Sequence, residues 1–200
     1  CTEPGRAMQA SSEEHVLDIY KKNILIASEI GAKFVCIPML LDLKNNTLEQ
    51  EKEKFIHYYE QLIPFAEKYD MPISNECARE KANGVALEIA KHFNSKYYTV
   101  CPDLEAWRFD TPDLPLGAHC EDPSAGKPIP EPIELFKACM PYAPYIHFKL
   151  LSLNEEGEEL HFPIPEMMDI INKSPIDHYL CVEYEGWIPD IHPERDSYIE

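Results

Sequence analysis

The sequence contains no cluster of basic residues. Only 18 lysines and arginines stand against 36 aspartates and glutamates, which gives a formal net charge of −18. Nucleic-acid binding depends on clustered lysines and arginines that neutralise phosphates, so we expect no nucleic-acid partner. A carboxylate-rich protein is better suited to hold a cation.

Long hydrophobic runs are also missing. No apolar segment approaches the roughly 20 residues needed to span a bilayer, and the first residues lack the apolar region of a signal peptide. The seven cysteines form an odd set without any Cys-x-x-Cys spacing. Free thiols in strand-like runs pack as small hydrophobes, so a reducing compartment is expected. These absences predict a cytoplasmic protein without a membrane partner.

The remaining composition is that of one globular domain. The chain has 200 residues, of which 44% are hydrophobic, and this suffices for one sizeable core. We therefore expect a single domain over residues 1–200. Strand-like and helix-like segments alternate, with links long enough for crossover connections. That alternation predicts parallel strands and an α/β fold, in which active sites lie at the carboxyl ends of the strands.

Hydrophobic patterns place the expected elements. Strands are expected at 33–38, 71–76, 97–101, 145–150 and 179–184. Helices are expected at about 11–30, from residue 47 onward, around 85–93, at about 131–140 and near 165–171. Pro64 lies inside the helix that Thr47 caps and should kink or split it. The proline-rich segment 102–130 has little regular pattern, and loops of that length tend to be functional.

Polar side chains stand at the ends of four expected strands. In the strand 145–150, alternation puts His147 and Lys149 on one face, where buried polar groups must be paired or functional. Carboxylates stand at the ends of three other strands, at Glu76, Asp103 and Glu183. Three carboxylates and one imidazole are a ligand set for a divalent metal. The alternative is four unrelated residues: carboxylates that cap helices or pair with lysines, and a hydrogen-bonded core histidine.

Four segments carry a resemblance to a known family. They are Leu-Ile-Pro-Phe-Ala-Glu-Lys at 62–68, Pro-Asp-Leu-Glu-Ala-Trp at 102–107, Ile-His-Phe-Lys at 146–149 and Val-Glu-Tyr-Glu-Gly at 182–186. In order and spacing they resemble the xylose-isomerase-like TIM barrels, a superfamily of sugar isomerases, sugar-phosphate isomerases and epimerases. The Glu-Tyr-Glu-Gly ending and the Pro-Asp element resemble the branch that includes the catalytic subunits of C-glycoside deglycosidases.

The resemblance implies a (β/α)8 TIM barrel that is incomplete here. It assigns the expected strands to the fourth through eighth of the barrel, so that the first three strands and part of the last helix would be missing. Parallel strands in an open arc would leave two edges exposed. We therefore expect a truncated chain or one whose missing part a partner supplies, as a homo-oligomer or a complex with a second subunit.

The same resemblance implies a ligand set and a mechanism. Glu76, Asp103, His147 and Glu183 would hold one divalent cation, with manganese first and magnesium, cobalt or zinc as variants. In this family the metal binds adjacent sugar oxygens and stabilises an enediolate. Glu76 and Glu183 would remove and return the proton next to the sugar carbonyl. This predicts a metal-dependent isomerase or epimerase that acts on a small sugar.

Further residues are candidates for contact with the substrate. Lys149 either polarises a substrate oxygen, as a third catalytic residue, or pairs with Asp103 or Glu183 for charge balance. The candidates for substrate binding are Arg79, Trp107, His119 and Glu185. The plainer alternatives are a solvated loop for the arginine, packing for the tryptophan, a loop position without function for the histidine and a helix entry for the glutamate.

Two positions depart from the family pattern. Relatives often carry a histidine where this sequence has Ala78, and many epimerases carry one where it has Ala106. If those histidines handle protons or bind substrate, this protein must do so differently. His119, in the long loop, is a candidate replacement.

Two other functions stay open. A C-glycoside deglycosidase subunit would use the same proton abstraction beside a ketone at sugar carbon 3, and this would cleave the bond to the aglycone. That hypothesis predicts a second, unrelated subunit and an aromatic pocket. Alternatively, a truncated barrel would keep the ligand set without activity and act as a binding or interaction module. Resemblance in fold cannot choose among substrates.

Overall fold

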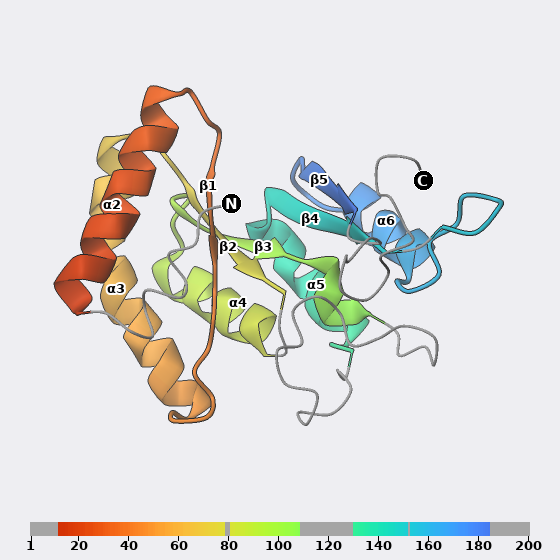
Figure 1. Cartoon of the computed structure of the whole chain (residues 1–200), viewed down its shortest axis with the longest axis horizontal. Coiled ribbons are helices and arrows are strands. Elements are labelled where there is room, and N and C mark those ends of the chain that lie inside the picture. Colours follow the sequence, from red (N-terminus) through yellow and green to blue (C-terminus); the bar gives the residue numbers. More distant parts are fainter. Residues whose placement is uncertain (1–11, 79–80, 109–129, 152, 185–200) are drawn as a thin grey trace, which may run out of the picture.

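The computed structural model describes residues 12–78, 81–108, 130–151 and 153–184. Strands and helices alternate along this part of the chain (Figure 1). The strands are β1 (Val35–Pro38), β2 (Ile73–Cys77), β3 (Tyr98–Pro102), β4 (Tyr145–Leu150) and β5 (Tyr179–Tyr184). The α-helices are α2 (Glu13–Glu29), α3 (Leu48–Lys68), α4 (Ala82–Phe93), α5 (Ile133–Cys139) and α6 (Ile164–Asn172). Short 3-10 helices, η1 (Leu104–Trp107) and η3 (Met140–Tyr142), follow β3 and α5.

The strands run parallel in two groups. One sheet has the order β1-β2-β3, and β4 pairs with β5 in the other. Within the described ranges, a single parallel bridge, between Asp103 and His147, links the two groups. The described residues therefore form an α/β structure with parallel strands and no closed barrel, which confirms the fold class predicted from the sequence.

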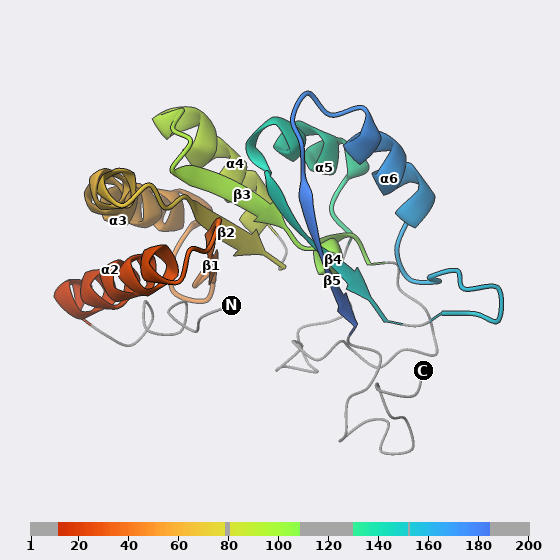
Figure 2. The ribbon, with the colours of Figure 1, turned by 90° about the horizontal axis from the view of Figure 1, so that it is seen from above.

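The helices cover one side of these strands. Helices α2 to α6 follow one another along that side, and the strands lie next to them (Figure 2). Helices α2, α4 and α5 contact the strands directly, and the buried apolar residues of α4 include Val85 and Ile89. The strands direct alternate side chains toward this layer, among them Ile73 and Val100. Among the described helices, none is long and apolar enough to cross a membrane.

Helix α3 shows how local sequence sets an element. Thr47 and Gln50 form a capping box, in which each side chain binds the other residue's backbone N–H. Of the two effects expected of Pro64, the split is wrong, because α3 runs on to Lys68 with Pro64 inside it, and the kink stays a prediction. The apolar neighbours on its buried face, Leu62 and Ala66, are 0% exposed. Their packing offsets the backbone hydrogen bond that a proline removes.

Side chains from distant strands meet on the inner side of the arc. Near the start of the strands, the Phe34 ring lies 5.9 Å from that of Tyr145 and 5.6 Å from that of Tyr179, measured between centroids. Phe34 precedes β1, whereas the two tyrosines begin β4 and β5. The arc is therefore curved enough for a side chain just before β1 to reach those that begin β4 and β5.

Candidate metal centre

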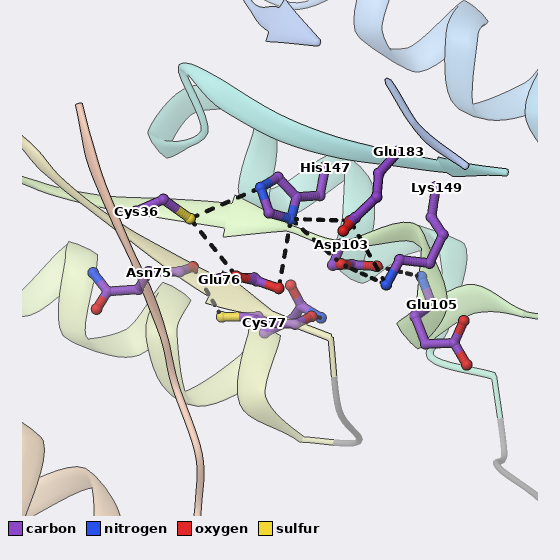
Figure 3. Close-up of polar contacts among 10 residues, drawn as sticks. Cys36, Asn75, Glu76, Cys77, Asp103, Glu105, His147, Lys149 and Glu183 are labelled. Atoms are coloured by element: carbon purple, nitrogen blue, oxygen red, sulfur yellow. Dashed lines mark hydrogen bonds and ion pairs between the residues drawn. The ribbon is translucent and has the colours of Figure 1, made fainter. Parts of the chain in front are cut away.

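Four polar side chains meet on the inner side of the strands, near their carboxyl ends (Figure 3). Glu76 belongs to β2 and Asp103 directly follows β3. His147 lies in β4 beside Asp103, and Glu183 lies in β5. Parallel strands end at the same edge of a sheet, and alternation sends these side chains to one face. The structure thus brings together the four residues that the sequence predicted as metal ligands.

The imidazole of His147 lies at the centre of this group. Its Nδ1 is 3.5 Å from Glu76 Oε1, 3.5 Å from Asp103 Oδ2 and 3.7 Å from Glu183 Oε2. These separations exceed the usual length of a hydrogen bond. Three carboxylate oxygens therefore surround one ring nitrogen without being close enough to bond to it well.

Two atoms of this group are buried and lack a hydrogen-bond partner among the described residues. They are Asp103 Oδ2 and His147 Nδ1, whose side chains are 0% and 7% exposed. Buried polar atoms are rarely left in this way unless an ion or water satisfies them. The atoms of Glu76, Asp103 and His147 also lie within 4.8 Å of one another, which suits a shared metal ion.

The arrangement fits a divalent cation. Ligand atoms about 2.0–2.2 Å from one ion lie about 3.0–3.6 Å from one another in octahedral or tetrahedral coordination. The separations of 3.5 Å that His147 Nδ1 makes with Glu76 and Asp103 lie in that range. Carboxylate oxygens with one imidazole suit Mn²⁺, Mg²⁺ and Zn²⁺. These residues can therefore hold such an ion with little rearrangement.

The charges of the group change its pKa values. Burial by itself would lower the pKa of His147, but its contacts with Asp103, Cys36 and Glu76 raise that pKa well above the ordinary value. Burial would likewise raise the pKa of Glu76, but the nearby imidazole holds it below the usual range. The carboxylates therefore favour a positive partner at Nδ1, either a proton or a metal ion.

Lys149 lies beside the same carboxylates. Its Nζ is 3.4 Å from Asp103 Oδ2 and 3.8 Å from Glu183 Oε2, and its side chain is 1% exposed. A buried ammonium requires such partners, because desolvation of an unpaired charge is costly. Lys149 therefore pairs with Asp103 and Glu183, as one of the two alternatives expected, and a role in polarising a substrate oxygen stays a prediction.

The predicted substrate-binding residues have separate outcomes. Trp107 is 2% exposed; its Nε1 donates a hydrogen bond to the carbonyl oxygen of Pro132, and its ring packs edge-on against Phe136. This is the packing role, and it leaves almost no indole surface for a sugar. Arg79, His119 and Glu185 lie outside the described residues. Their roles stay predictions. Two alanines stand where the family pattern led us to expect histidines. They lie in different surroundings: Ala106 is buried in η1, and Ala78 directly follows β2.

Sequence reasoning missed that two thiols adjoin the site. Cys36 Sγ lies 3.9 Å from His147 Nε2 and 3.8 Å from Glu76 Oε2. Cys101 belongs to the same cluster. Both cysteines were expected to act only as small apolar residues. The shared phase of Cys101 and Asp103 along one strand was the available signal for the inward direction of that thiol.

The chain resembles known proteins in structure and not in sequence. No protein-family model matches the sequence, and no curated protein matches it. Among solved structures, a xylose isomerase-like TIM barrel protein from Mycobacterium smegmatis, in complex with magnesium, matches with a TM-score of 0.53 and 18% identity. That match covers 85% of this chain and 60% of the other.

Two further solved structures give the same result. The IolI protein with a bound zinc atom matches with a TM-score of 0.58 and 15% identity over 90% of this chain and 63% of the other. The apo form of 3-keto-D-glucoside 4-epimerase, YcjR, from E. coli matches with a TM-score of 0.54 and 12% identity over 86% and 63%. The chain thus has the fold of xylose-isomerase-like TIM barrels and spans 60 to 63% of the length of these structures.

Proposed function

We propose that this partial xylose-isomerase-like barrel belongs to a divalent-metal-dependent sugar isomerase or epimerase. The observation that carries the proposal is the convergence of three carboxylates on His147 Nδ1, at 3.5, 3.5 and 3.7 Å. The likeness to a 3-keto-D-glucoside 4-epimerase supports a carbonyl-containing sugar as the substrate class. Manganese is the proposed ion, and magnesium or zinc are alternatives because they occur in neighbouring structures.

The exposure of the four side chains suggests which of them hold the ion and which transfer the proton. All four side chains are proposed ligands of the ion, and the buried Asp103 and His147 serve only to hold it. Glu183 is the most open of the carboxylates, with a side chain that is 39% exposed, against 15% for Glu76. Glu183 is therefore the better candidate to take the proton from the carbon next to the sugar carbonyl, and Glu76 to return it. When bound, the cation would act as a Lewis acid for the sugar oxygens.

Lys149 has a positioning role in this proposal. Its ammonium lies between Asp103 and Glu183, which limits the positions that the Glu183 carboxylate can take. An ordered carboxylate is needed for proton transfer, because the base must lie within hydrogen-bond reach of the proton it removes. In this proposal, Lys149 thus holds the Glu183 carboxylate in position for proton transfer and does not itself contact the substrate.

The proposal is tested by metal binding and proton exchange. We expect one Mn²⁺ per chain and exchange of the proton next to the carbonyl with deuterium from solvent, followed by NMR over a panel of ketohexoses. Mutation of residues that hydrogen-bond to a metal ligand typically lowers metal affinity or activity by about 10–100-fold, and mutation of a ligand itself should cost at least as much. Glu183→Gln should therefore weaken binding by about 100-fold or more and abolish exchange.

A carboxylate outside the site provides the matched control. Glu158 lies in the exposed turn near Asn154, so Glu158→Gln should leave both binding and exchange unchanged. A wild-type chain that binds no Mn²⁺, or binding that Glu183→Gln leaves intact, would refute the metal centre. Binding without exchange on any sugar would favour the non-catalytic binding module.

A C-glycoside deglycosidase subunit is the second candidate. The observation that favours it is the likeness to an enzyme whose named substrate is a 3-keto-D-glucoside, since the same carbonyl position activates the bond to an aglycone. This candidate requires release of the aglycone from a 3-oxo-C-glycoside, which chromatography detects directly. Exchange on free ketohexoses without aglycone release would reject it.

A further inference from the structure

The imidazole of His147 has a second polar neighbourhood on the side opposite the carboxylates. Its Nε2 faces Cys36 Sγ at 3.9 Å (Figure 3). Ligand atoms of Cys36, Cys101 and His147 all lie within 4.8 Å of one another. The two thiols also interact directly, and this contact raises the pKa of Cys36 more than its burial does. Two thiols and an imidazole are the ligands that soft and borderline cations prefer.

A disulfide does not account for this pair of thiols. Cys36 lies in β1 and Cys101 in β3, and β2 runs between them. Two interstrand spacings separate the backbones by about 9.5 Å, whereas a disulfide needs Cα atoms less than about 7 Å apart. The thiols can share a ligand between them, but they cannot bond to each other without movement of a strand.

We propose that Cys36, Cys101 and Nε2 of His147 form a second metal site, which binds one soft cation such as Zn²⁺ or Cd²⁺. In a tetrahedral zinc site, with about 2.3 Å to sulfur and about 2.0–2.1 Å to nitrogen, neighbouring ligands lie about 3.5–3.8 Å apart. The separation of 3.9 Å between Cys36 Sγ and His147 Nε2 is close to that range. Glu76 Oε2, 3.8 Å from Cys36 Sγ, is placed to complete the ligand set.

The site has an entry route from the inner side of the arc. Cys36 lines a cavity of about 310 Å³ together with the aromatic residues Phe34, Tyr145 and Tyr179. The Cys36 side chain is only partly buried, whereas that of Cys101 is fully buried and does not line the cavity. A cation that enters this cavity meets the Cys36 thiol first.

The two sites compete for one imidazole. A neutral imidazole has a lone pair on one nitrogen and a proton on the other. A soft cation on Nε2 therefore leaves a proton on Nδ1, where the carboxylates accept it, and removes one ligand from the candidate metal centre. A hard cation on Nδ1 leaves the proton on Nε2, facing the Cys36 sulfur. Soft metals should thus weaken Mn²⁺ binding, because they take the imidazole of His147 and share the Glu76 carboxylate.

Cadmium alone tests the second site. One equivalent of Cd²⁺ should produce the ultraviolet thiolate-to-metal charge-transfer band in the wild-type chain. The double variant Cys36→Ala/Cys101→Ala should lose the band. Cys139→Ala is the control: this thiol is also fully buried, but it lies in α5 on the outer side of the strands, so its loss should leave the band intact. A band that persists in the double variant, or that vanishes with Cys139→Ala, overturns the proposal.

Competition provides the second measurement. Saturation with Cd²⁺ should raise the apparent Kd for Mn²⁺ by about tenfold in the wild type and leave it unchanged in the double variant. Should the double variant fail to fold, Cys36→Ala alone, at a partly exposed position, should still reduce the band and the competition. A Cd²⁺ band without any Mn²⁺ binding would refute only the proposed function. Mn²⁺ binding without the band would refute only the proposed second metal site.

Discussion

Lys149→Met removes the buried ammonium beside the candidate metal centre. The Nζ atom lies 3.4 Å from Asp103 Oδ2, and the two side chains are 1% and 0% exposed. Loss of one partner from a buried ion pair costs about 3–5 kcal/mol, because the other charge stays buried. His147 Nδ1 also faces Asp103, at 3.5 Å. We therefore expect the free energy of unfolding to fall by the lower value, about 3 kcal/mol, without metal.

Added Mn²⁺ should act in the opposite direction on this variant. The ammonium and the cation would both adjoin Asp103 Oδ2, so the ammonium opposes metal binding by charge repulsion. Its removal should lower the Kd by about tenfold. A ligand at 100 times its Kd stabilises by about 2.7 kcal/mol, and at 1,000 times by about 4.1 kcal/mol. The same metal concentration should therefore stabilise the variant by about 1.4 kcal/mol more than the wild type.

Urea unfolding with and without Mn²⁺, together with calorimetric titration, measures both quantities. Lys173→Met is the matched control, because Lys173 pairs with Asp169 in an exposed ion pair whose lysine is 72% exposed. Exposed pairs contribute little to stability, so that variant should match the wild type in stability and metal affinity. If Mn²⁺ binds Lys149→Met more weakly than the wild type, the reasoning that places a cation beside Asp103 is refuted.

Three further predictions follow from the same residues and from α3. The raised pKa of His147 keeps a proton on Nδ1, and the metal must displace that proton. Mn²⁺ affinity should therefore rise with pH by about tenfold per unit across neutrality. Calorimetric titration in buffers of different ionisation enthalpy should detect about one proton released, and a pH-independent Kd would contradict ligation by Nδ1. Asp103→Asn keeps the side-chain shape but removes its charge, so Mn²⁺ affinity by calorimetry should fall by about 100-fold, and unchanged affinity would exclude Asp103 as a ligand. Thr47→Ala should lower the free energy of unfolding by about 1 kcal/mol through loss of the capping box, whereas Thr47→Ser should retain it; equal losses in urea unfolding would show that the hydroxyl does not cap α3.

Local patterns explain why the elements could be predicted. Alternation of apolar residues marks β4 and β5, and their observed bounds agree with the expected ones. The start of α4 was expected near Val85 but lies at Ala82. The N-cap, Lys81, has a left-handed backbone and makes no side-chain cap, so the sequence holds no capping residue that would have predicted the start of α4. Helix α3 passes Pro64 because tertiary packing outweighs local preference.

The strand ends also placed most of the candidate site. Glu76, Asp103, His147 and Glu183 could be grouped because parallel strands finish at one edge, and the chain order alone decides which residues stand there. The direction of Trp107 could not be predicted in this way. Its indole turns toward Phe136 and Pro132, and that contact depends on where α5 packs.

By itself the sequence determined the order of strands and helices, the parallel α/β class and the four polar residues at the strand ends, because each depends on spacing along the chain. Only the tertiary structure decided what those residues face. The curvature of the arc brings Cys36 from β1 to His147 in β4, 111 positions later, and places Lys149 between two carboxylates. Such contacts depend on the angles between strands, and no local pattern of residues encodes those angles.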